Sequence, residues 1–163
     1  MIKEIDKSNI AECVNVIRKS FQTVADEFGF TPDNAPRFTA FATTEERLVY
    51  QLEIEHRLMA AYFDEDGDNR ILGYYSIQFL ENVECELNNL CVLPECRHKK
   101  IGEALLEDAV ARAKSKNCTR MKIGIVEENT VLRRWYEKHE FVHTNTIKYD
   151  FFPFTCGYME RDI

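Results

Sequence analysis

A short basic loop that leads into an apolar helical pattern carries the most informative chemistry of this sequence. The stretch from Leu90 to Leu106 is typical of a strand, a loop and a helix. The free N–H groups of a first helical turn, at the positive end of the helix dipole, form an anion site. Gly102 would let a phosphate approach the backbone closely. We predict phosphate binding, with a solvated helix start as the alternative, at Arg97, His98, Lys99, Lys100, Ile101 and Gly102.

The loop matches neither of the two common nucleotide-binding motifs, and no metal site is indicated. It lacks the Gly-Lys-Ser/Thr of the P-loop and the spaced glycines of the dinucleotide-binding turn. His139 and His143 have zinc-like spacing, but they straddle a helix end and a strand start with no third ligand nearby. The six cysteines contain no C-x-x-C pair, so we expect reduced, mostly buried thiols, with a nucleophilic cysteine as a minor alternative.

Length and charge restrict the classes of function. A chain of 163 residues supports a core without disulfides or metal, and we interpret residues 1–163 as a single domain. With 21 basic and 28 acidic residues, the net charge is −7, which disfavours nucleic acid and anionic membranes as partners. The longest apolar-rich run, 71–80, is half of the about 20 residues that a membrane span needs. The acidic N-terminus does not resemble a signal peptide, so we expect a cytoplasmic location.

The elements that must position the loop follow from hydrophobic periodicity. A strand, a helix and a strand over 86–126 predict a parallel pair with a right-handed crossover, whereas Asp66-Gly67 predicts an antiparallel hairpin. Ser8 and either Thr43 or Thr44 are the expected N-caps of the first two helices. We expect strands at 2–5, 57–63, 69–80, 82–93, 121–126, 141–152 and 158–161, and helices at 8–28, 44–52, 101–117 and 129–138.

Two motifs, in this order, resemble the signature of the GNAT N-acetyltransferase superfamily. The first, R/Q-x-x-G-x-G/A, here spans Arg97 to Ala104, with Lys100 where the family usually has a glycine. The second is an asparagine, a helix and Tyr-x-x-x-Gly-Phe, here Asn129 to Phe141 with Glu140 replacing the glycine. The resemblance implies a mixed α/β fold: a central, mostly antiparallel sheet with a splayed parallel strand pair, flanked by about four helices.

The resemblance also implies acetyl-CoA as co-substrate and assigns roles to single residues. The pyrophosphate would lie on the basic loop, and the pantetheine arm along the backbone of Cys91 and Val92. The Val92 N–H, or a neighbouring one, would polarise the thioester carbonyl. Tyr136 matches the tyrosine that protonates the departing thiolate, and Asn129 matches a residue that hydrogen-bonds the pantetheine arm. The alternatives are a core aromatic ring for Tyr136 and a simple N-cap for Asn129.

The general base is expected at Glu86. Some members of the family carry a glutamate base on this strand, and strand alternation places Glu86 on one face with Glu84 and Asn88. Six residues separate it from Val92, roughly 20 Å along an ideal strand, so we expect a water relay. The alternative is a surface glutamate that only attracts cationic acceptors.

The acceptor pocket is expected between the loop after the first helix and the C-terminal strands, where phenylalanines concentrate. Core packing or a homodimer contact would also explain these rings. The expected function is acetyl transfer to a small-molecule or peptide amine by direct attack in a ternary complex; a non-catalytic acyl-CoA sensor of the same fold is the alternative. The acidic chain favours a cationic acceptor. The rings are Phe28, Phe30, Phe38, Phe41, Phe151, Phe152 and Phe154.

Overall fold

A seven-stranded mixed sheet forms the centre of the computed structural model, which describes all 163 residues. Only one of its six strand pairs, β4 with β5, is parallel, in the order β1-β2-β3-β4-β5-β7-β6. The strands are β1 (Ile2–Glu4), β2 (Leu58–Phe63), β3 (Ile71–Phe79), β4 (Glu84–Val92), β5 (Arg120–Val126), β6 (Val142–Ile147) and β7 (Cys156–Asp162).

Five helices surround the sheet, rather than the four expected. They are α1 (Ile10–Phe28), α2 (Thr39–Ala42), α3 (Glu45–Glu53), α4 (Ile101–Ser115) and α5 (Thr130–Lys138). The additional one, α2, is a single turn in the segment predicted as a loop. None of the helices combines the length and the hydrophobicity that crossing a lipid bilayer requires.

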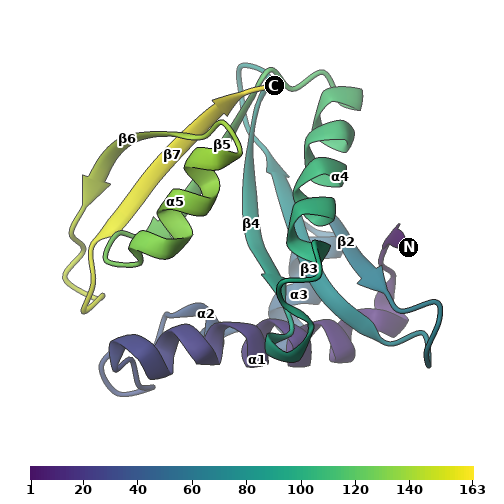
Figure 1. The fold of residues 1–163 in the computed structure, drawn as a ribbon, viewed down its shortest axis with the longest axis horizontal. Coiled ribbons are helices and arrows are strands. Elements are labelled where there is room, and N and C mark those ends of the chain that lie inside the picture. The colour runs from purple at the N-terminus through teal and green to yellow at the C-terminus, as the bar shows by residue number, and fades with distance from the viewer.

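The parallel pair separates after three residues, as the resemblance implied. Glu84–Glu86 pair with Arg120–Lys122. Beyond these residues β4 continues to Val92 and β5 to Val126, but the two strands no longer pair with each other. In Figure 1 the two strands diverge toward α1, with β3 and α4 on one side of the gap and β6, β7 and α5 on the other. Backbone groups of both strands are therefore available to a ligand within the sheet.

The two long helices cover opposite faces of the sheet. Along β3, Tyr74 lies beside Cys13 of α1, while the hydroxyl of its neighbour Tyr75 donates to Asp108 of α4 at 2.6 Å. Because successive strand residues point to opposite faces, α1 and α4 sandwich β3. This strand is accordingly buried from Ile71 to Ile77, which fixes the position of β4 beside it.

Two predicted boundaries are wrong. Ser8 does not cap the first helix: Asp6 accepts its N–H at 2.7 Å, and a short 3₁₀ turn precedes α1. The strand predicted at 141–152 stops at Ile147, because the hairpin with β7 needs a connection, which residues 148–155 supply. Thr44 does cap α3, accepting the Arg47 N–H at 3.2 Å.

Candidate functional site

A cavity of about 310 Å³, here the central cavity, lies where β4 and β5 separate. Residues 86–90 of β4 and 123–126 of β5 form two of its walls. The others come from α1, residues 37–39, α5, the β6–β7 connection and β7. Its lining is mostly apolar. Of the phenylalanines expected at a pocket, Phe38, Phe152 and Phe154 line it, whereas Phe28, Phe30 and Phe41 belong to the small core cluster behind it.

The α4 N-terminus has the free amides that an anion site requires. The backbone N–H groups of Ile101, Gly102 and Glu103 have no hydrogen-bond partner in the protein. Lys100, the residue that departs from the family motif, has a left-handed backbone conformation with φ 62°, which favours glycine. The backbone thus retains the geometry of the glycine, and the side chain adds a positive charge. His98 shares this conformation, and His98, Lys99 and Lys100 are exposed.

Arg97 links the basic loop to α1 by hydrogen bonds. Its Nη2 donates to the Ser20 carbonyl at 2.9 Å and to Thr23 Oγ1 at 3.0 Å, and its Nε donates to the Val92 carbonyl at 3.3 Å. Only Nη1 has no protein partner. We therefore assign Arg97 a larger part in positioning the loop than in direct phosphate contact.

Gly102 is not required by the protein's own packing. A Cβ built there would lie 3.7 Å from Val92 Cγ2 and 3.8 Å from Trp135 Cζ2, which are ordinary contacts. The fold therefore has room for alanine here, and the absence of a side chain leaves the backbone open to a close approach. Trp135, the single tryptophan of the chain, lies beside this position.

The Val92 N–H points into the gap. The Leu93 N–H donates to the Leu72 carbonyl at 2.9 Å, so these two residues form a hydrogen-bonded pair of the β3–β4 ladder. Antiparallel pairs alternate, and the Val92 N–H and C=O therefore face away from β3. The bond from Arg97 to the Val92 carbonyl agrees with this orientation. By the same alternation the Cys91 N–H and C=O face Tyr74 of β3, and its side chain is buried, so the free backbone groups here are those of Val92.

Tyr136 lines the central cavity from α5. Its side chain is 6% exposed, and its ring packs edge-on against Trp135 and Phe141. The hydroxyl makes no hydrogen bond with the protein. Burial, and secondarily the nearby Cys91 thiol, raise the pKa of Tyr136, so the hydroxyl stays protonated at neutral pH.

Asn129 serves as the N-cap of α5 and also lines the cavity. Its Oδ1 accepts the Leu132 N–H at 3.2 Å, which is the alternative considered from the sequence. Its Nδ2 makes no hydrogen bond with the protein, and the side chain is part of the cavity wall. Capping therefore leaves a donor available to a ligand.

Glu86 is the last residue of β4 that pairs with β5, and it lines the central cavity. Its Oε1 accepts a hydrogen bond from Asn88 Nδ2 at 2.6 Å, as their shared face predicted. Burial raises the pKa of Glu86, against the opposing effects of Arg57, Asn88 and Lys122. A β-bulge follows at 88–90, where Asn89 has φ 54°, so the regular alternation holds only up to Asn88. The raised pKa makes this carboxylate a stronger base than an ordinary glutamate.

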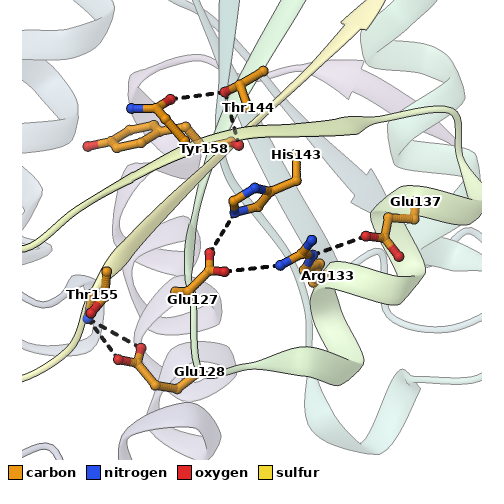
Figure 2. A network of polar contacts seen from close by, with 9 residues as sticks. Glu127, Glu128, Arg133, Glu137, His143, Thr144, Thr155 and Tyr158 are labelled. Carbon is orange, nitrogen blue, oxygen red and sulfur yellow. Dashed lines mark hydrogen bonds and ion pairs between the residues drawn. The ribbon is translucent and has the colours of Figure 1, made fainter.

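A polar network braces the segment that carries Asn129 and Tyr136 (Figure 2). Glu127 accepts from Arg133 at 3.0 Å and contacts His143 Nε2 at 2.8 Å, which joins α5 to β6. A Cβ at Gly157 would lie 2.0 Å from Glu127 Oε2, so a side chain there would displace this carboxylate. His143, which has zinc-like spacing from His139, contacts Glu127, and no group of three metal-binding side chains forms.

Several residues of the site carried no signal in the sequence. Leu132 adds apolar lining, and Tyr158 lines the cavity with its hydroxyl 3.1 Å from that of Tyr149. Arg37 reaches the same wall from the loop after α1. These residues come from separate elements, so only the folded chain brings them together.

The comparisons with known proteins agree with this geometry. The model of the acetyltransferase (GNAT) family matches residues 23–141. The spermidine N(1)-acetyltransferase of Thermoplasma acidophilum is 31% identical over 85 residues, which is 52% of this chain and 52% of that protein, so the match spans about half of the curated relative.

Solved structures share the fold. The PaiA N-acetyltransferase of Thermoplasma acidophilum in complex with coenzyme A aligns with a TM-score of 0.83 and 20% identity, over 100% of this chain and 98% of that one. The ribosomal-protein-S18-alanine N-acetyltransferase of Escherichia coli aligns with a TM-score of 0.77 and 12% identity, over 100% and 93%. Because the family model covers most of the chain, the protein belongs to the GNAT acetyltransferase family.

Proposed function

We propose that the protein is an acetyl-CoA-dependent N-acetyltransferase in which a primary amine attacks the thioester directly. One observation carries the proposal: an acid, Tyr136, and a base, Glu86, come from different elements and line one cavity. This cavity occupies the gap between β4 and β5, toward which the Val92 N–H points. An acid, a base and an oxyanion donor are the groups that amide formation from a thioester needs.

The residues beside the gap fit coenzyme A. The unpartnered amides of Ile101, Gly102 and Glu103, with exposed basic side chains around them, suit a pyrophosphate. The room beside Gly102 suits a close approach to the backbone. The free edge of β4 suits the amides of a pantetheine arm. When bound, acetyl-CoA supplies the thioester that makes the acetyl group transferable.

The protein's side chains then handle two protons. A primary ammonium has a pKa of about 10, so only about one molecule in a thousand is free amine at neutral pH. Glu86 accepts this proton through water, the amine nitrogen bonds to the carbonyl carbon, and the carbon–sulfur bond breaks. Tyr136 donates its proton to the leaving sulfur, and the second proton of the amine, which leaves as the amide forms, returns through water to Tyr136. The Val92 N–H stabilises the developing oxyanion, a contribution of about 3 kcal/mol for a preorganised donor.

The proposal is tested by measuring thiol release from acetyl-CoA with a panel of amines. Mass spectrometry of the reaction identifies the N-acetylated product. We expect release that depends on an amine and saturates with it. Binding of coenzyme A without thiol release with any amine would contradict an enzyme and support the non-catalytic acyl-CoA sensor.

A further inference from the structure

A second cavity adjoins the first and is almost entirely polar. This polar recess, of about 240 Å³, lies between α2, α3 and the face of β4 that carries Glu86. It shares Arg37, Thr39, Glu86, Asn88 and Asn89 with the central cavity, so the two spaces meet at Glu86. Its other lining residues are Ala42, Thr43, Arg47, Gln51, Arg57 and Gln78.

The charge of the polar recess is opposite to that of the chain. Three arginines line it, and Glu86 is its only acidic residue, although the whole protein has a net charge of −7. Arg57 already forms an ion pair with Glu55 at 2.7 Å and donates a hydrogen bond to Asn88 Oδ1 at 3.0 Å. Arg37 and Arg47 have no carboxylate within ion-pair distance, and the Arg37 guanidinium stacks over the Phe151 ring at 4.2 Å. Two guanidinium groups are therefore available to an anion.

A buried polar side chain in the same recess also lacks a partner. Gln51 is 5% exposed, and its Oε1 is buried without a hydrogen bond. Such an atom costs free energy unless something binds it, and buried polar groups are normally satisfied. Gln51 lies on α3, one turn after Arg47, and both line the recess. An amide oxygen accepts hydrogen bonds, so it would receive an N–H or O–H of a ligand whose anionic group is held by the unpaired arginines.

We propose that the acceptor amine carries an anionic group, a carboxylate or a phosphonate, which binds at Arg37 and Arg47. This inference rests on the proposed function. In such a zwitterion, the ammonium group is attracted to Glu86, where the two cavities meet. The anionic group of the same molecule is attracted to Arg37 and Arg47. The amine is then presented to the central cavity. A polyamine carries positive charges alone and would meet two unpaired arginines, so the local charge outweighs the acidity of the whole chain.

The test compares matched amines by thiol release at saturating acetyl-CoA. The panel contains the common amino acids, their carboxamides, aminoalkylphosphonates, and the polyamines putrescine and spermidine. We expect kcat/KM for the preferred carboxylate or phosphonate to exceed that of its neutral counterpart at least tenfold. Comparison of the amino acids with the aminoalkylphosphonates decides whether a carboxylate or a phosphonate is bound. Equal or faster turnover of carboxamides or polyamines would overturn the inference and leave the acetyltransferase intact; no turnover of any amine would contradict both.

Substitution of the recess residues provides the second arm. Arg47→Gln should raise the KM of the anionic acceptor about tenfold with little change in kcat or in coenzyme A affinity. Arg47→Glu should shift the preference toward cationic amines. Arg70→Gln, an exposed arginine in the β2–β3 turn outside both cavities, is the control and should change nothing. An unchanged acceptor preference in Arg47→Glu, or a lower coenzyme A affinity in Arg47→Gln, would overturn the assignment.

Gln51→Met separates a binding role from a structural one. Methionine has a similar size and removes the unpartnered oxygen, so the melting temperature should stay the same or rise while the KM of the anionic acceptor increases. If Gln51 only stabilised the fold, the melting temperature would fall and the acceptor kinetics would not change. That pair of results would contradict the proposal.

Discussion

The proposed donor side and the proposed acceptor side of the site are built in different ways. The donor side uses the backbone of one continuous stretch, from the Val92 N–H to the amides of Gly102 and Glu103. The acceptor side uses side chains from separate segments, such as Arg37, Gln51 and Glu86. A backbone site tolerates sequence change as long as the chain keeps its course, whereas a side-chain site changes its ligand with single substitutions. The predictions below test this difference.

The largest effect is expected at the donor side, from a side chain placed against the backbone site. Gly102→Asp should weaken coenzyme A binding by more than 100-fold, because it sets a carboxylate against the pyrophosphate. Gly102→Ala should weaken it about tenfold while leaving the free energy of unfolding unchanged or about 1 kcal/mol higher, since the fold has room for a methyl group and alanine favours helix. Calorimetry with coenzyme A and thermal unfolding measure both. Unaltered binding in Gly102→Asp would place the phosphates elsewhere.

Removal of the proposed acid should affect turnover alone. Tyr136→Phe should lower kcat about 100-fold with coenzyme A affinity nearly unchanged. Because burial raises the pKa of Tyr136, the wild type should show no loss of activity from its ionisation below about pH 10. Tyr74→Phe is the matched control, since Tyr74 is fully buried, its hydroxyl has no partner and it lines neither cavity. A loss that appears wholly in donor affinity would mean that the Tyr136 ring only packs.

The proposed base should be visible in the pH dependence. Burial raises the pKa of Glu86, so the wild-type rate should fall with decreasing pH at a higher value than the about 4.3 of an ordinary glutamate. Glu86→Gln should lower the rate about tenfold at neutral pH and recover as the pH approaches the pKa of the amine. Glu84→Gln, on the same face but paired with Lys122 at 2.7 Å, is the control. A raised acceptor KM with an unaltered profile would make Glu86 only an attractor of cations.

The same contrast explains what the sequence could predict. The basic loop before α4 and the parallel strand pair follow from continuous patterns in the sequence, whereas the splaying of that pair and the place of Tyr136 in the site were implied only by the resemblance to the GNAT superfamily. The recess was not, because Arg37, Arg47 and Gln51 look like ordinary loop and helix residues until α2 and α3 fold against β4. The predicted strand at 141–152 was too long, since the alternating aromatic residues beyond Ile147 serve the cavity wall and not a strand.

The most direct test of the account is a titration of the wild-type protein with coenzyme A and with pantetheine, followed by Trp135 fluorescence. Trp135 is the only tryptophan, and it lies between the Gly102 backbone and Tyr136. The account predicts a saturable change with coenzyme A and much weaker binding of pantetheine, which lacks the phosphates that the α4 N-terminus would hold. Equal affinity for the two ligands would contradict the donor site, and with it the assignment of the cavity between β4 and β5 as the place of acetyl transfer.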